Sequence, residues 1–292
     1  MDKVSIIGIG KLGSHLFYAL KNAGYKHIFK IEKKTTQKYF DNAIQNSDVI
    51  FICTKDSDIN NVVGILSTMN PTSSKKIIFH NSGAINSGIL KPLKNKKTAI
   101  GSFHPVQTFN TRTKRFSDNF KGIFIAIEGD IIAVKKGISI AKIVGSKPFI
   151  IDSKNKVLHH INSVIASNYL VTLIHQITKI YDKSSKSDKN KKIFINGFKN
   201  VKIFDIYEPL IRTTINNIGS EGVFKALTGP IARNDYNTLE LHLKSLKKLD
   251  YGILQFYVNM GIETINIALT KKSLKKNEAI KLTDLFNKYS NK

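Results

Sequence analysis

A histidine stands next to a proline at the end of a predicted strand, in the stretch Ser102-Phe103-His104-Pro105. The proline restricts the backbone at this point. An imidazole held there is well placed to hydrogen-bond a carbonyl and to transfer a proton near neutral pH. A lone histidine can also serve packing alone. His104 is therefore a candidate active-site residue, with a structural role as the alternative.

Two other polar corners follow apolar runs that predict strands. Thr54 and Lys55 come after the run at residues 49–53, and Asn81 and Ser82 come after the run at residues 76–80. In open α/β sheets the ligand lies outside the carboxyl ends of the strands. Lys55 is placed to bind a phosphate or a substrate carboxylate there. Thr54, Asn81 and Ser82 are placed to reach a bound nucleotide. A helix cap is the alternative for the first corner.

A three-glycine motif opens the chain. Gly8, Gly10 and Gly13 follow a short apolar run and precede a predicted helix. In such a turn the first glycine makes the bend, the second lets the backbone approach a pyrophosphate, and the third lets the helix pack on the strand. The helix N-terminus then faces the anion, with Lys11 and Leu12 in its first turn. The motif predicts a dinucleotide site, and a glycine turn without a ligand is the alternative.

The residues after the second predicted strand bear on which dinucleotide binds. Glu32 could accept the ribose hydroxyls of NAD, whereas Lys33 and Lys34 could neutralise the 2′-phosphate of NADP. Two adjacent cations outweigh one carboxylate that can turn to solvent. We therefore expect NADP as the cofactor, with NAD possible. No residues are assigned to a metal.

The elements that would position these residues fall into two parts. Up to residue 152, short β-rich runs alternate with amphipathic stretches, which predicts a doubly wound, mainly parallel α/β Rossmann sheet. Residues 153–292 show helical periodicity and predict an all-helical second domain. The predicted strands are 3–8, 27–31, 49–54, 76–80, 98–103, 123–128 and 148–151, and the predicted helices are 157–181, 203–217, 219–227, 236–248 and 252–269.

Charge and composition limit the partners. The formal charge is +25, but only four of the 46 basic residues are arginine, the residue that nucleic-acid recognition usually recruits. Scattered lysines favour a solvated surface, and we expect no nucleic-acid partner. The stretch 157–181 is apolar but interrupted by histidine, asparagine and glutamine, so we expect no membrane insertion. The only cysteine, Cys53, lies in an apolar run and suits a reducing cytoplasm.

Several motifs together resemble one known family. They are His80-x-Ser82-Gly83, His104-Pro105-x-Gln107-Thr108-Phe109, the helix segment 160–168 with Ala166-Ser167-Asn168, and the run Leu227-Thr228-Gly229-Pro230-Ile231-Ala232-Arg233-Asn234-Asp235 with His242. The chain resembles Rossmann-like proteins that carry a helical C-terminal domain of unknown function. This resemblance implies NADP binding, a C-terminal domain similar to that of 6-phosphogluconate dehydrogenase, and a homodimer formed through the helical domain.

A looser resemblance is to ketopantoate reductases, which use a lysine after a strand, an Asn-Gly corner, and a lysine plus an asparagine on the first long helix of the second domain. Lys55 and Asn81 match the first two features, although the closer family more often has threonine in place of Asn81. His160 stands where the catalytic lysine of these reductases would be. A histidine can do this work, because a protonated imidazole is a proton donor to the alkoxide left by hydride addition, and Asn168 would then polarise the carbonyl.

The remaining polar residues of the long motif complete the hypothesis. Arg233 or Lys55 would pair with a substrate carboxylate, and Asp235 would orient a cation or bind a substrate hydroxyl. A structural pair of Arg233 and Asp235 at a helix start is the alternative. We therefore expect an NADPH-dependent reductase of a small 2-oxo acid, with 2-dehydropantoate as the best single candidate. A pyrroline-5-carboxylate reductase-like imine reductase and a nucleotide-sensing protein without turnover are the alternatives.

Overall fold

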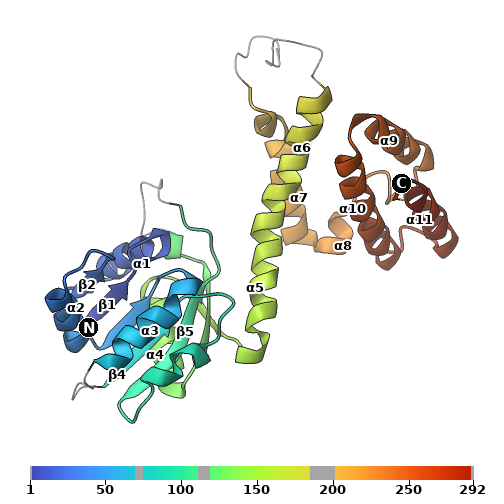
Figure 1. Ribbon diagram of the computed structural model, residues 1–292. Coiled ribbons are helices and arrows are strands. Elements are labelled where there is room, and N and C mark those ends of the chain that lie inside the picture. Colours follow the sequence, from blue (N-terminus) through green and yellow to red (C-terminus); the bar gives the residue numbers. More distant parts are fainter. Residues whose placement is uncertain (1, 70–74, 111–118, 185–200, 291–292) are drawn as a thin grey trace. The chain divides into compact units, whose positions relative to one another are not determined.

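The computed structural model describes residues 2–69, 75–110, 119–184 and 201–290. The chain divides into two compact units, residues 1–168 and 169–292. Figure 1 shows a sheet flanked by helices in the first unit and helices alone in the second. The sequence predicted the division at Asp152, and the first unit also includes residues 153–168 of the helix that follows the last strand.

Seven strands form one sheet in the order β2-β1-β3-β4-β5-β6-β7. The first five strands are parallel, β6 runs antiparallel to β5, and β7 is parallel to β6. The predicted mainly parallel α/β sheet is therefore confirmed, with a reversed edge. The strands are β1 (Val4–Ile7), β2 (Ile28–Ile31), β3 (Val49–Ile52), β4 (Lys76–His80), β5 (Thr98–Pro105), β6 (Phe124–Gly129) and β7 (Lys147–Ile150).

Apolar side chains alternate between the two faces of the sheet, and helices cover both faces, as a parallel sheet requires. One face packs against α1 (Lys11–Asn22) and α4 (Ile131–Ile143). The other face packs against α2 (Gln37–Asn46), α3 (Ile59–Thr68) and the 3₁₀ segment η2 (Ser87–Leu93). A second 3₁₀ turn, η1 (Asp56–Asp58), leads into α3. This layering leaves the carboxyl ends of the parallel strands open for a site.

The helix after the sheet is continuous but irregular. It begins with η4 (Ser153–Asn155) and α5 (Lys156–Val164), passes through one π-helical segment, η5 (Ile165–Tyr169), and continues as α6 (Leu170–Ser184). By length and composition, residues 153–184 could cross a bilayer, and none of their most apolar window is buried in the structure. That criterion is weak, because a helix that packs against other protein passes it too.

The second unit has its core in three helices, α9 (Tyr236–Leu249), α10 (Tyr251–Thr270) and α11 (Lys276–Ser290). Helix α11 was not among the predicted helices. Within residues 201–290, α7 (Ile203–Glu221) and the short α8 (Val223–Ala226) precede these three helices. Residues 170–184 and 203–226 contribute no buried side chain to this core. The predicted helical character of the second domain is confirmed.

Candidate active site

The glycine turn between β1 and α1 has the geometry of a phosphate-binding turn. Gly8 has a φ of +95°, which favours glycine, and a Cβ on Gly13 would lie 2.1 Å from the carbonyl oxygen of Gly8. The second glycine, Gly10, has no atom within 4 Å of where its Cβ would be. The outer two glycines are therefore required by the protein itself, whereas Gly10 has open space beside it, which would let a pyrophosphate approach the backbone.

The turn lies at the topological switch point of the sheet. In the order β2-β1-β3, the strand that follows β1 in sequence lies on one side of it, and the next strand, β3, lies on the other side. This reversal opens a crevice between the ends of β1 and β3. Gly8 and Thr54 line this crevice, because a Cβ on Gly8 would lie 3.0 Å from the backbone nitrogen of Thr54.

Two features of this crevice fit a dinucleotide. The hydroxyl oxygen of Thr54 is buried and has no hydrogen-bond partner among the described residues. Helix α1 has no side-chain cap on its N-cap residue, Gly10, and no acidic residue in its first turn. An anion at the helix N-terminus would complement both. Gly10, Lys11, Leu12 and Thr54 would therefore hold the diphosphate of a bound cofactor.

The lysines predicted to bind ligand are exposed in the first unit. Lys33 and Lys34 lie in a turn after β2, beyond the switch point, and Lys55 precedes the 3₁₀ turn η1. The hydroxyl of Thr35 accepts a hydrogen bond from the backbone of Glu32 at 2.8 Å, which fixes this turn. The contacts of Lys33 and Lys34 with NADP, and of Lys55 with substrate, stay predictions.

Asn81 and Ser82 are buried and brace the end of β4. The Asn81 amide donates to the Phe103 carbonyl at 2.6 Å, and its oxygen accepts from the Cys53 thiol at 3.2 Å. The Ser82 hydroxyl donates to Asp56 at 2.7 Å. These bonds join the ends of β3, β4 and β5. Both side chains are engaged with protein, so their predicted cofactor contacts stay predictions.

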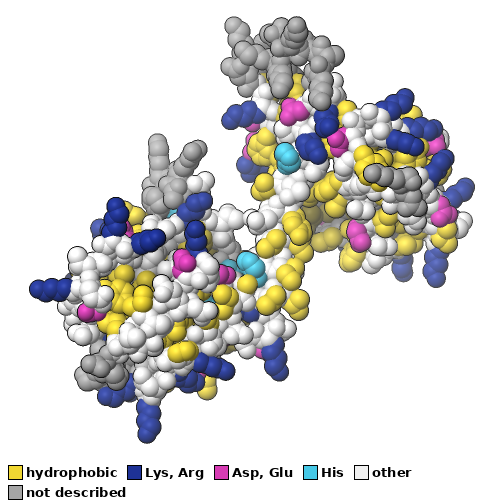
Figure 2. All heavy atoms as spheres, in the orientation of Figure 1, with side chains coloured by type: hydrophobic (Ala, Val, Ile, Leu, Met, Phe, Trp, Pro, Cys, Tyr) yellow, Lys and Arg dark blue, Asp and Glu magenta, His cyan; other side chains and the backbone are white. Residues whose placement is uncertain are grey.

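Beside this corner, histidines from the sheet and from α5 converge on Gly83. A Cβ on Gly83 would lie 2.5 Å from His160 Nδ1 and 2.7 Å from His104 Nε2. The His104 ring centroid lies 5.6 Å from that of His159 and 6.2 Å from that of His160. Figure 2 shows histidine side chains together on this surface of the first unit. The structure thus brings together His104 and His160, two of the predicted catalytic residues.

The electrostatics of this cluster keep several rings neutral. Burial, assisted by the nearby ammonium of Lys156, lowers the pKa of both His80 and His104 to about 3. The same two causes lower the pKa of His159. Nitrogen atoms of His80, His104, His159 and His160 are buried without a hydrogen-bond partner in the described structure. The cluster therefore presents unsatisfied imidazole nitrogens, and burial keeps the rings of His80 and His104 uncharged near neutral pH.

Asn168, the third predicted catalytic residue, lies in the π-helical segment. His160 and Asn168 are eight residues apart, which in an unbroken α-helix would rotate them about 80° from each other. One π turn accommodates one extra residue, so the spacing corresponds to seven α-helical positions and the rotation falls to about 20°. The π turn thus places Asn168 on the same stripe of the helix as His160.

Sequence reasoning missed a buried ion pair beneath the histidines. Lys156 and Glu128 are 1% and 4% exposed, with Nζ and Oε1 3.8 Å apart. The sequence held one signal of this pair. Glu128 is a carboxylate at the end of the apolar run Phe124-Ile125-Ala126-Ile127, and a charge buried with such a run requires a partner. His159 was also not assigned to the site, although it adjoins His160.

Arg233 and Asp235 belong to the second unit. Asp235 is the N-cap of α9, where its carboxylate accepts hydrogen bonds from the backbone and hydroxyl of Thr238 at 3.1 and 2.8 Å. Arg233 is exposed two residues earlier. Asp235 thus caps the helix through Thr238, whereas its predicted pairing with Arg233 and the substrate contacts of both residues stay predictions.

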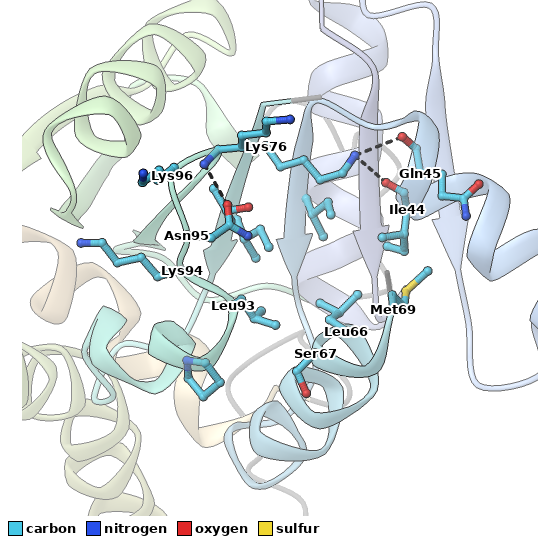
Figure 3. Close-up of a pocket in the computed structure, with 15 residues that line it drawn as sticks. Ile44, Gln45, Leu66, Ser67, Met69, Lys76, Leu93, Lys94, Asn95 and Lys96 are labelled. Atoms are coloured by element: carbon cyan, nitrogen blue, oxygen red, sulfur yellow. Dashed lines mark hydrogen bonds between the residues drawn. The ribbon is translucent and has the colours of Figure 1, made fainter. Parts of the chain in front are cut away.

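The cavities at the opposite edge of the sheet hold lysines with structural partners. One cavity of about 590 Å³ is lined by the starts of β4 and β5 (Figure 3). There the Lys76 ammonium donates to the carbonyl oxygens of Ile44, Gln45 and Ser47 at 2.8–3.1 Å, which satisfies the end of α2. Lys76 is thus a helix cap. Figure 2 shows the other basic side chains spread over the visible surface.

Comparison with known proteins agrees with this architecture. Residues 2–105 match the model of a Rossmann-like domain, and residues 123–264 match a domain of unknown function, DUF2520. No curated protein matches the sequence. The recognised combination of a Rossmann-like domain with this helical domain is confirmed.

Solved structures share the fold across both units. Protein TM1727 of Thermotoga maritima is 22% identical with a TM-score of 0.68, covering 92% of this chain and 99% of its own. Protein BF3122 of Bacteroides fragilis, assigned as an NADP oxidoreductase, is 21% identical with a TM-score of 0.63, covering 90% and 97%. The pyrroline carboxylate reductase of Plasmodium falciparum, with NADP bound, is 15% identical with a TM-score of 0.52, covering 98% and 99%.

Proposed function

Because the chain joins a Rossmann-like domain to the DUF2520 domain, we propose that it is an NADPH-dependent reductase of a small carbonyl compound. The observation that carries this proposal is the convergence of His104 and His160 on Gly83, in the same compact unit as the glycine turn. Proton-transfer groups beside a dinucleotide crevice are what carbonyl reduction requires. NADP-bound or NADP-assigned proteins with this fold support the choice of cofactor.

The chemistry divides between the cofactor and the histidines. The glycine turn and Thr54 would hold NADPH, which when bound would supply the hydride for the carbonyl carbon. His104, neutral at physiological pH, orients and polarises that oxygen by a hydrogen bond. His160 gives the oxygen its proton, and Asn168, on the same helix stripe, adds a second donor. Lys55 holds a carboxylate on the substrate.

We propose a 2-oxo acid as the substrate class, with 2-dehydropantoate as the first compound to test. Lys55, exposed beside the crevice, supports a carboxylate substrate. A cyclic imine is the second candidate, because the pyrroline carboxylate reductase of Plasmodium falciparum shares the fold over almost the whole chain. His160 would then protonate the substrate nitrogen in place of the oxygen.

Oxidation of NADPH in the presence of either substrate tests the assignment. We expect absorbance to fall with one of the two compounds. His160→Ala should reduce kcat by about 100-fold, because a positioned general acid contributes about that much, while the Kd for NADPH stays within about twofold. Asn155→Ala, at an exposed position next to α5, serves as a control. NADPH binding without turnover of either compound would favour a nucleotide sensor.

We further propose that a second copy of the chain covers the apolar side chains of α6 and α7. These neighbouring helices bury no side chain, and they expose large apolar ones, such as Leu210 on α7, which is 64% exposed. Helices of this kind gain little stability without a packed face. Light scattering should give a dimer that Leu210→Lys dissociates and Leu241→Lys, equally exposed on α9, leaves intact. A monomeric parent protein would contradict this. We propose a cytoplasmic location because the chain has one cysteine, Cys53, which is partly buried and free.

A further inference from the structure

A row of buried polar residues crosses the sheet beneath the histidine cluster. His80 on β4 pairs in register with Ser102 on β5, which pairs in register with Glu128 on β6. Residues in register project to the same face of a sheet, and these three are 0–4% exposed. The ammonium of Lys156, at the start of α5, donates a hydrogen bond to the Ser102 hydroxyl from above this row.

The Lys156 charge is only partly compensated. Glu128 lies 3.8 Å away, and both carboxylate oxygens already accept hydrogen bonds of 2.7 Å from the backbone and hydroxyl of Ser87. Burial lowers the pKa of Lys156 to about 8, while Glu128 and Asp56 oppose that shift. A well-packed apolar pair at such a place is often as stable as an ion pair. Anchoring the helix therefore does not by itself require a charge here.

The position of Lys156 connects it to the site. It lies three residues before His159 and four before His160, so the same turn of α5 presents all three side chains on one side. The charged and titratable groups that face its ammonium are Glu128 from β6, Asp56 from η1, His80 from β4, His104 from β5 and His159 from α5 itself.

We propose that Lys156 is a positioning residue of the histidine site, which fixes the first turn of α5 on the sheet through Ser102 and Glu128 and places a positive charge beside the facing imidazoles. It does not touch substrate, because it is buried under the cluster. Its positive charge adds to the burial that lowers the pKa values of His80, His104 and His159. The kinetic part of this proposal rests on the proposed reductase function, and the electrostatic part does not.

Titration of the histidine rings by NMR in the full-length protein tests the proposal directly. Lys156→Met removes the charge and retains most of the side-chain volume, and Lys156→Arg retains the charge. We expect the pKa values of His80 and His104 to rise by about one unit in Lys156→Met and to stay as in the parent in Lys156→Arg. In kinetics, kcat should fall about tenfold in Lys156→Met with the Kd for NADPH unchanged.

Glu128→Gln provides a second test that keeps the lysine. It retains an acceptor for Ser87 and removes the negative charge that faces Lys156, so the pKa of the Lys156 ammonium should fall further. Unchanged histidine titration in Lys156→Met, with only a lower melting temperature, would overturn the proposal and leave a structural lysine. Unchanged titration of Lys156 in Glu128→Gln would also overturn it. Absence of any turnover in the parent protein would refute the reductase assignment and leave the electrostatic result standing.

Discussion

His104 and His160 meet edge to face, with ring centroids 6.2 Å apart and an interplanar angle of 71°. One ring comes from the end of a sheet strand and the other from the first helix beyond the sheet. Only the missing side chain of Gly83 lets them approach, because a Cβ there would collide with a nitrogen of each ring. The site therefore depends on a glycine that does no chemistry.

Replacing Gly83 with alanine should remove activity without removing the cofactor. The new methyl group would displace one or both imidazoles, and a displacement of about 1 Å can cost about 100-fold in turnover. Steady-state kinetics should show that fall in kcat, with the Kd for NADPH changed less than about threefold. Gly64→Ala on α3, where a Cβ meets nothing within 4 Å, should leave kcat unchanged. Full activity in Gly83→Ala would show that the two rings do not act together.

The π turn predicts that Asn168 matters and Asn162 does not. Both are exposed asparagines on one continuous helix, but only Asn168 shares the His160 stripe. Asn168→Leu should lower kcat about tenfold by removing a hydrogen-bond donor to the substrate oxygen, and Asn162→Leu should leave it unchanged. Equal kinetics for the two variants would contradict the alignment that the π turn provides.

The turn after β2 should decide between NADPH and NADH. Lys33→Gln with Lys34→Gln should weaken NADPH binding by about tenfold or more, because a charge-assisted hydrogen bond to phosphate contributes about 1.5–3 kcal/mol. NADH lacks the 2′-phosphate and should bind nearly as before. Lys38→Gln, exposed on α2, is the matched control. An equal loss for both cofactors would show that neither lysine binds the 2′-phosphate.

Acid should destabilise the protein through its neutral histidines. The pKa of His80 and of His104 falls from 6.5 to about 3 in the folded chain. Between these values the unfolded chain binds protons that the folded chain does not, so stability is complete above about pH 6.5 and falls as the pH is lowered toward 3. Each histidine contributes a slope of up to about 1.4 kcal/mol per pH unit. Chemical denaturation should reveal that slope, and His80→Asn should reduce it; a flat profile would contradict the buried neutral state.

Local patterns sufficed for much of the fold. The strand at Lys76–His80 coincides with its predicted bounds, and the glycine turn lies where its spacing placed it. The reversal of β6 could not be predicted, because a run of buried apolar residues has no direction. Helix α11 was missed because lysines and asparagines surround its apolar positions, such as Leu282 and Phe286, and weaken the periodicity.

Only part of the site was predicted, because some of its residues have no local sequence signal. His104 and His160 stood out because a histidine at a strand end or on a helix suggests chemistry from local sequence alone. Lys156 did not, since a lysine at a helix start normally faces solvent. Its burial follows from Glu128 and Ser102, which tertiary folding brings to it from other strands. Long-range partners of this kind cannot be inferred from spacing.

The account depends most on a dinucleotide held by the glycine turn. Isothermal titration calorimetry with NADPH, on the parent protein and on Gly10→Val, tests this directly, because Gly10 has open space around it and the substitution should leave the fold and the melting temperature intact. We expect saturable binding to the parent protein and none to Gly10→Val. Equal binding to both proteins, or no binding of NADPH or NADH to the parent, would contradict the central claim.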